Sequence, residues 1–408
     1  MRDRLLSRFL SYVRVNTQAR EDVNASPSSE GQNTLLSMLK GELEQMRIHV
    51  TLTEHGCLYA NIEASEGYEH ISPVGFVAHV DTSPDFSGEG VAPEIHEDYD
   101  GGDIITASGR VIGVRDFPHL ARLRGHTVIT SGGDTLLGAD DKAGVAEIIC
   151  AIERIIEENI PHGRIVIAFT PDEEIGMGTA HFDIERFGCE FAYTLDGSAA
   201  GEIEYENFNA ARATVRFAGN NVHPGTAKGV MINAARLAAA FDTALPSDER
   251  PENTEGYEGF YHLCSMSGDV ESALLEYILR DHDRSKLEEK KERILSLAAA
   301  MCEQYGEGRV RVEIREQYSN MASIINRPEN RRVLDIAKRA ITECGLSPVS
   351  RAIRGGTDGA SISYMGVPCP NLGTGGYAFH GPFEHASLDE MSAAAEIILR
   401  IVAITREG

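Results

Sequence analysis

The chain has 408 residues, with 63 acidic against 38 basic side chains and a formal charge of −25 at pH 7. A surface this acidic repels phosphate backbones, so we expect no nucleic-acid partner. A hydrophobic content of 42% and a charged content of 25% are typical of soluble globular proteins, and the length exceeds that of one ordinary core, so we expect two domains.

The sequence also favours a cytoplasmic protein without a membrane anchor. No apolar run approaches the roughly 20 residues that are needed to span a bilayer. Residues 1–10 have charges scattered through an amphipathic pattern, which is not the apolar core of a signal peptide. The seven cysteines are dispersed without a Cys-x-x-Cys pair, which indicates a reducing compartment and no disulfide or zinc-finger framework.

The N-terminal part of the chain alternates between helical and extended patterns. Apolar residues recur every three or four positions over residues 2–14 and again after Ser29, and both stretches predict amphipathic helices. Two strands are predicted at 49–53 and 57–62. The continuous apolar run 74–78 is typical of a strand that is buried on both faces.

Residues 82–134 are rich in Gly, Pro, Asp and Ser, and they predict irregular connections with short strands. A strong helical pattern begins near residue 140. Strands are then predicted at 164–169 and 191–195, separated by a short helix near 182–187. This alternation of strands and helices predicts an α/β fold with a mostly parallel sheet and flanking helices.

The pattern changes after residue 208 to that of a compact α+β unit. Its predicted strands are 211–217, 261–267, 273–280 and 309–316, and its predicted helices lie near 232–243 and 284–305. Helices near 331–345 and 387–405 follow. We therefore expect a first domain in two pieces, 1–208 and 319–408, with an inserted α+β lid domain at 209–318.

Acidic and histidine side chains follow the strands of the predicted parallel sheet. His79 and Asp81 end one strand, and because residues two apart on a strand share a face, Asp81 can orient the His79 ring. Asp140 and Asp141 stand where a short apolar run meets a helix. Side chains at such a junction project into the crevice where open α/β proteins bind ligands. The alternative for this pair is a structural role as first-turn acids that suit the helix dipole.

The next two strands end in acids as well. Glu173 and Glu174 close the strand at 164–169, where one could coordinate a metal while the other moves a proton. The alternative is an acid cluster at a helix N-terminus. Asp196 ends the following strand and, taken alone, is equally consistent with a helix cap.

Downstream, the glycine-rich segment 373–381 contains His380. No helix is predicted to begin there, as a nucleotide site would require, so we interpret the segment as a loop that delivers this histidine to a crowded site. We expect the nearby His385 to be a surface residue.

Three residues are candidates for contacts with a substrate. His223 lies just before a turn in a loop of the inserted unit. Arg354 offers a guanidinium within a flexible Gly-rich segment, which suits the binding of a carboxylate. Arg280 ends an inserted strand and could have the same task, with an exposed ion pair as the alternative.

Two histidines and at least three carboxylates at strand ends suit zinc, manganese or cobalt. The absence of cysteine ligands favours a catalytic metal site over a structural one. Five ligands that share one carboxylate could hold two metal ions, which lie roughly 3.5–4 Å apart in two-metal hydrolases.

Five longer motifs span the sequence: Gly75–Pro84 (GFVAHVDTSP), Leu137–Gly144 (LGADDKAG), Ala168–Glu174 (AFTPDEE), Asn220–Gly229 (NNVHPGTAKG) and Arg354–Gly359 (RGGTDG). With these motifs the sequence resembles, over essentially its whole length, the dizinc peptidases of the aminoacylase and glutamate carboxypeptidase clan. Within that clan it is most similar to the aminopeptidases that act on tripeptides.

The resemblance implies a set of metal ligands for two zinc ions. Asp140 would bridge both ions, His79 and Asp196 would complete one site, and Glu174 and His380 would complete the other. It also implies a cis peptide bond after Asp140.

The resemblance further implies that Glu173 is the general base. It also implies that Asp81 orients the ring of His79. The inserted unit would be a lid that brings His223 to the substrate, while Arg354, with Arg280, would hold the substrate carboxylate. The implied activity is release of the N-terminal residue from tripeptides with a free N-terminus, with Mn²⁺ or Co²⁺ as possible substitutes for Zn²⁺.

Three sibling specificities are the nearest alternatives: dipeptidase, carboxypeptidase and N-acyl amino acid deacylase. A catalytically silent binding protein on the same fold is a further alternative, which the complete set of ligands together with Glu173 argues against. An exposed edge of the lid could also mediate a homodimer.

Overall fold

The computed structural model describes residues 1–407, which form two compact units. The first unit comprises Met1–Tyr205, Met321–Arg351 and the chain from Thr357 onward. The second unit comprises Glu206–Asn320 together with Ala352–Gly356. The short segment that contains Arg354 therefore belongs with the inserted strands.

The first unit is built on an eight-stranded sheet in the order β1-β2-β8-β3-β9-β16-β10-β15. Its strands are β1 (His49–Leu52), β2 (Leu58–Ile62), β3 (Val74–His79), β8 (Ile165–Thr170), β9 (Phe191–Gly197), β10 (Glu202–Asn207), β15 (Val349–Ile353) and β16 (Asn371–Gly373). The central strands β8, β3, β9 and β16 are parallel, which confirms the predicted fold class. Strands β1, β2 and β10 pair antiparallel, and the β1–β2 connection is too short for the crossover that a parallel pair needs.

Helices cover both faces of this sheet. Its helices are α1 (Arg2–Val13), α2 (Glu30–Gln45), α3 (Ala139–Glu157), α4 (Ile184–Phe187), α7 (Ala322–Ile325), α8 (Arg332–Glu343), α9 (Asp358–Tyr364) and α10 (Leu388–Arg406). On one face Val77 and Ala192 pack with Phe187 of α4 and Ile362 of α9. On the other face the Tyr193 hydroxyl donates to a carbonyl of α8, and α3 packs against β3 and β9.

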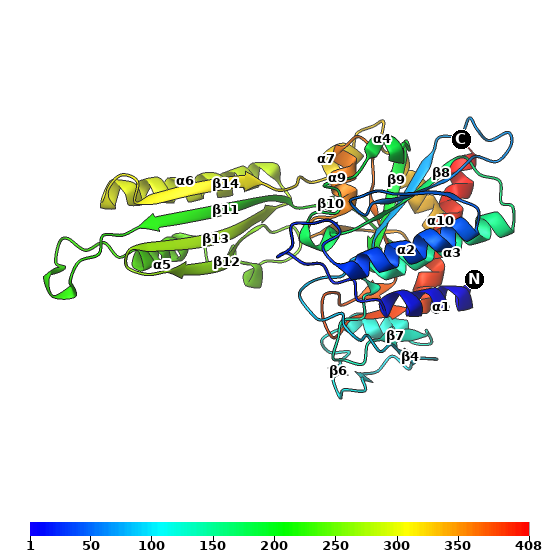
Figure 1. The fold of residues 1–408 in the computed structure, drawn as a ribbon, viewed down its shortest axis with the longest axis horizontal. Coiled ribbons are helices and arrows are strands. Elements are labelled where there is room, and N and C mark those ends of the chain that lie inside the picture. Colours follow the sequence, from blue (N-terminus) through cyan, green and yellow to red (C-terminus); the bar gives the residue numbers. More distant parts are fainter. Residues whose placement is uncertain (408) are drawn as a thin grey trace. The chain divides into compact units, whose positions relative to one another are not determined.

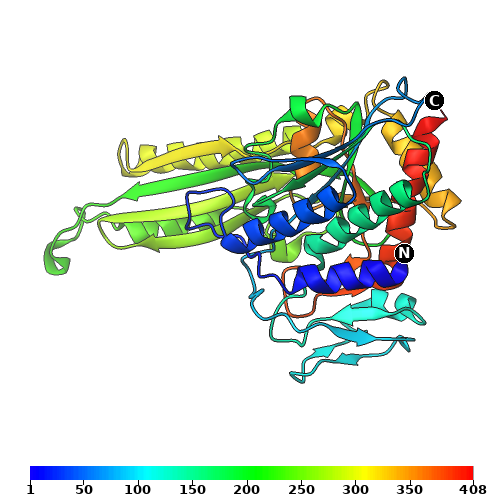
Figure 2. The ribbon, with the colours of Figure 1, turned by 45° about the vertical axis from the view of Figure 1, so that its right-hand side comes forward.

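The region 82–134 contributes two strands to a small second sheet of the first unit, which has the order β17-β18-β7-β4 and takes its other two strands from the C-terminal part of the chain. Its strands are β4 (Glu94–His96), β7 (Val128–Thr130), β17 (Gly376–Tyr377) and β18 (His385–Ser387), with a separate hairpin of β5 (Ile104–Ile105) and β6 (Val111–Ile112). Both ribbon views show the cyan strands of residues 82–134 beside α1 (Figures 1 and 2). His385 is fully buried in β18, so the expectation of a surface residue was wrong, because the strand pairs with β7 from a distant part of the chain.

The second unit is a four-stranded antiparallel sheet, β12-β13-β11-β14, covered by two helices (Figure 1). Its elements are β11 (Asn209–Ala218), α5 (Ala234–Ala244), β12 (Phe260–Gly268), β13 (Ser272–Asp281), α6 (Arg284–Tyr305) and β14 (Val310–Glu316). Alternate residues of the strands, such as Val215 and Leu275, pack on Phe241 of α5 and Ile294 of α6. Both helices therefore cover the same face of the sheet.

A six-residue 3-10 helix lies at Pro118–Leu123, and single 3-10 turns lie at Glu173–Ile175, Pro224–Thr226 and Pro251–Asn253. Among residues 1–407, no helix is both long enough and apolar enough to cross a membrane.

Candidate metal centre

Three neighbouring parallel strands of the first unit carry three of the five candidate ligands at their carboxyl ends. His79 is the last residue of β3, Glu173 and Glu174 form the 3-10 turn after β8, and Asp196 lies near the end of β9. Because β8, β3 and β9 are adjacent in the sheet, these side chains converge at one edge.

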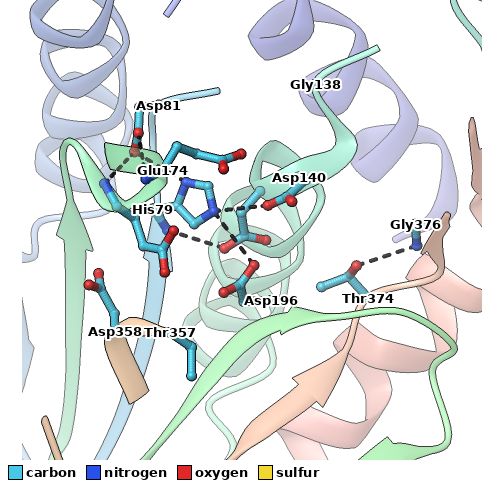
Figure 3. A network of polar contacts seen from close by, with 12 residues as sticks. His79, Asp81, Gly138, Asp140, Glu174, Asp196, Thr357, Asp358, Thr374 and Gly376 are labelled. Atoms are coloured by element: carbon cyan, nitrogen blue, oxygen red, sulfur yellow. Dashed lines mark hydrogen bonds and ion pairs between the residues drawn. The ribbon is translucent and has the colours of Figure 1, made fainter. Parts of the chain in front are cut away.

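His79 lies at the centre of the cluster (Figure 3). Its Nε2 atom is 2.9 Å from Asp140 Oδ1 and 3.5 Å from Asp196 Oδ1, while its Nδ1 atom is 3.2 Å from Asp81 Oδ1. The backbone N–H of His79 donates to Asp141 Oδ2 at 3.1 Å. The His79 ring is thus held between a carboxylate that can orient it and two carboxylates that face the same nitrogen.

His380 approaches Asp140 from the other side. Its Nε2 atom is 3.0 Å from Glu174 Oε2 and 3.4 Å from Asp140 Oδ2. The two oxygens of Asp140 therefore face two different histidines, Oδ1 towards His79 and Oδ2 towards His380. This is the arrangement that a carboxylate bridging two cations requires.

Two buried acids, Asp81 and Asp172, hold the turn that carries Glu173 and Glu174. Asp81 accepts hydrogen bonds from the backbone N–H groups of both glutamates, at 3.0 and 3.1 Å. On the far side, Asp172 accepts from the Ser28 backbone N–H at 3.0 Å and from Gln32 Nε2 at 2.8 Å. The turn is fixed from two directions, so the two glutamate side chains have defined starting points.

The backbone around Asp140 is also special. The Asp140–Asp141 peptide bond is cis, as the resemblance implied. Gly138 just before it has a φ of +81°, in the left-handed region that favours glycine. Helix α3 then packs so closely on β9 that a Cβ atom at Gly144 would lie 2.0 Å from the Leu195 carbonyl oxygen.

Burial and the crowding of like charges strongly shift the pKa values of the acids in the centre. Burial raises the pKa of Glu173 well above its ordinary value, the charge of His79 opposes this, and Asp196 adds to the rise. Burial likewise raises the pKa of Glu174 to about 7 and that of Asp196 to about 6. So many buried carboxylates are costly without cations, which favour their charged forms.

The donor set fits divalent metal ions. One ligand atom each from His79, Asp140 and Glu174 lies within 4.8 Å of the others, and the same holds for His79, Asp141 and Asp196. The buried Glu174 Oε1 atom has no hydrogen-bond partner among residues 1–407, as expected for an oxygen that binds a cation. Histidine nitrogens mixed with carboxylate oxygens suit zinc, manganese or cobalt.

The three candidate substrate contacts all lie in the second unit. His223 is exposed, and its Nδ1 atom accepts the Gly225 backbone N–H at 3.1 Å. Arg354 donates to the carbonyl oxygens of Gly256 and Glu258 at 2.8 and 2.9 Å. Arg280 is buried and donates to backbone carbonyls, with its guanidinium 5.1 Å from the centre of a tyrosine ring, so the alternative of an exposed ion pair was wrong.

Two buried acids of the first unit were not among the predicted site residues. Asp358, in the RGGTDG motif, accepts from Thr170 Oγ1 at 2.6 Å and raises the pKa of the nearby Glu173 by its charge. Glu384 accepts backbone N–H groups from the segment that leads to Asp140. A motif already marked Asp358, whereas no local pattern marks Glu384.

The parallel sheet and the cluster of histidines and carboxylates at its edge are those expected of a metallopeptidase. Residues 136–404 match the model of peptidase family M20/M25/M40, and the chain belongs to that family. The predictions of the family and of a peptidase are therefore confirmed.

More specifically, the chain is similar to peptidase T. It is 50% identical to peptidase T of Salmonella arizonae over 99% of both chains. It is also 50% identical to peptidase T of Salmonella paratyphi A, over 99% of this chain and 98% of the relative.

Solved structures have the same fold. A tripeptidase from Staphylococcus aureus superposes with a TM-score of 0.80 at 22% identity, covering 100% of this chain and 99% of the other. The aminopeptidase PepT from Bacillus cereus superposes with a TM-score of 0.77 at 23% identity, covering 99% of both chains. A dinuclear metal-binding peptidase of family M20 from Bacillus subtilis has a TM-score of 0.67 at 14% identity, over 100% and 98%.

Proposed function

We propose that this chain is an aminopeptidase that releases the N-terminal residue of tripeptides and uses two bound Zn²⁺ ions. The observation that carries the proposal is Asp140, whose two carboxylate oxygens face His79 and His380 on opposite sides. Asp196 and Glu174 stand beside these two histidines, one on each side. The relatives named peptidase T, at 50% identity along the whole chain, support the choice of substrate class.

The neighbouring glutamates receive different roles. Glu174 contacts His380 and shares a possible metal group with His79 and Asp140, so we assign it as a ligand. This leaves Glu173 as the general base, which takes a proton from the attacking water and passes it to the leaving amine. The bound ions would polarise the scissile carbonyl and lower the pKa of the water.

Asp81 completes this arrangement by acting on three groups at once. Its carboxylate lies against His79 Nδ1 and accepts the N–H groups of Glu173 and Glu174. One buried acid thereby fixes the ring orientation of a ligand and the position of the base.

The second unit would supply substrate contacts. Because the His223 Nδ1 atom accepts a hydrogen bond, the neutral ring carries its proton on Nε2, which suits donation to a developing oxyanion. We assign Arg354, and secondarily Arg280, to the substrate carboxylate. His223→Ala should lower turnover and leave the metal content unchanged, whereas loss of metal would make His223 a ligand.

The deciding experiment is hydrolysis of di-, tri- and tetrapeptides with free and with acetylated N-termini, with the released residue identified. We expect the free tripeptide to be cleaved fastest and to release its N-terminal residue. Release of the C-terminal residue would indicate a carboxypeptidase, preference for two residues a dipeptidase, and cleavage of acetylated substrates a deacylase. Absence of hydrolysis by the zinc-loaded protein would indicate a binding protein.

We also place the protein in the cytoplasm, because dispersed cysteines and small-peptide substrates suit that compartment. Homodimer formation through the second unit is a separate proposal, which sedimentation of the purified protein would test.

A further inference from the structure

Glu384 is a buried acid that the proposed chemistry does not use. It lies four residues after His380, in the segment between β17 and β18, and its relative exposure is 1%. An acid buried this deeply is rare without partners that satisfy its oxygens.

The partners of Glu384 are backbone amides of one short segment. Its Oε2 atom accepts the N–H groups of Leu137 and Gly138 at 2.7 and 2.8 Å, and its Oε1 atom accepts the Asp140 N–H at 3.1 Å. Successive N–H groups that converge in this way form a concave anion site. The side chain that fills the site comes from almost 250 residues further along the chain.

Glu384 therefore connects two loops that carry candidate ligands. One loop ends at Asp140, whose N–H it accepts, and the other begins at His380. The Glu384 N–H donates to the Gly381 carbonyl at 3.2 Å, which closes a turn directly after His380. Displacement of the carboxylate would move the two ligands relative to each other.

We propose that Glu384 is a positioning residue that fixes the Asp140 backbone relative to the His380 loop, so that the two Asp140 oxygens point towards separate metal ions. This inference rests on the proposed two-metal function. It assigns Glu384 no contact with substrate or metal.

A single substitution separates this role from simple packing. Glu384→Gln keeps the shape but replaces one acceptor oxygen by an NH₂ group, which can only donate. The remaining oxygen can still accept the two adjacent N–H groups of Leu137 and Gly138. The NH₂ group would then face the Asp140 N–H. The substitution therefore removes the acceptor of the backbone amide that belongs to the bridging residue.

The experiment measures the dissociation constants of the two Zn²⁺ ions by chelator competition, together with the thermal midpoint of the metal-free protein. Metal ligands lose about 10- to 100-fold in affinity when a supporting partner is removed. We therefore expect at least one of the two constants to rise about tenfold or more in Glu384→Gln.

Asp281→Asn is the matched control. Asp281 is also buried, at 2% exposure, and its Oδ1 atom accepts the Asp283 backbone N–H at 3.0 Å, but it lies in the second unit. We expect this control to lower the thermal midpoint to a similar degree and to leave both constants unchanged.

Wild-type dissociation constants for Glu384→Gln would overturn the inference. An equal loss of affinity in the Asp281→Asn control would also overturn it, since the effect would then follow from stability alone. If Glu384→Gln does not fold, Glu384→Asp, which withdraws the carboxylate by one methylene, is measured against the same criterion. Failure of the wild-type protein to bind two ions would instead refute the proposed function.

Discussion

His385 should make the stability of the first unit depend on pH. Its ring is fully buried, and burial lowers its pKa to about 4 from an ordinary value of 6.5. The carbonyl of Phe383, 2.8 Å from Nδ1, can only accept, so Nδ1 carries the proton. Nε2 must then accept from His119 Nε2 at 2.9 Å, and a second proton there would set two N–H groups against each other.

The sign and size of the effect follow from this shift. Between pH 6.5 and 4 the unfolded chain binds a proton at His385 and the folded chain does not, so stability falls as the pH falls. This contribution to stability is fully present above the unfolded-state pKa and is lost below the folded-state pKa. At about 1.36 kcal/mol for each pKa unit, it amounts to about 3 kcal/mol. Between pH 7.5 and 5, about 2 kcal/mol of it should be lost.

The assay is urea unfolding of the metal-free protein, followed by circular dichroism, at pH 7.5 and pH 5. His385→Phe should lose about 2 kcal/mol less between these pH values than the wild type. Phe117→Leu is the control, because Phe117 packs edge-on against the same ring, with the ring centres 6.3 Å apart, and does not titrate. The control should be less stable at both pH values with an unchanged pH dependence, and the same dependence in His385→Phe as in the wild type would refute the reasoning.

Three further predictions concern the candidate centre and its supports. Glu173→Gln should retain close to two metal ions but turn peptide over at least about 100-fold more slowly. Glu174→Gln should instead lose metal. If metal analysis and kinetics showed the opposite pattern, the roles of the two glutamates would have to be exchanged. Gln32→Leu removes a donor from the buried acid behind the Glu173 turn, so urea unfolding should show a loss of about 1–3 kcal/mol and kcat should fall more than KM changes. Gly144→Ala would bring a Cβ atom to 2.0 Å from a backbone oxygen and should cost about 1–3 kcal/mol in thermal unfolding, while Gly41→Ala in α2, with nothing within 4 Å, should be neutral or stabilising.

Elements with a strong local pattern could be predicted from the sequence. The helix expected at 284–305 has the same bounds as α6, and the apolar run 74–78 is the core of β3. The strand ends led directly to His79 and Asp196, because neighbouring parallel strands bring their carboxyl ends together.

Features that depend on distant pairing could not be predicted in this way. Strands β16 and β18 have three residues each, too few for a period to show. The burial of His385 and the bonds of Glu384 arise only when the C-terminal segment packs beside residues 128–140. Local sequence carries no signal for such pairing, and Glu384 in particular looks like any surface acid.

The place of β16 between β9 and β10 has a consequence for synthesis of the protein on the ribosome. When β9 has emerged, the strand that pairs with its free edge in the folded protein, residues 371–373, follows only about 175 residues later. His380 emerges later still. A nascent chain therefore cannot bring His380 to the other residues of the candidate centre until nearly all of it has been translated.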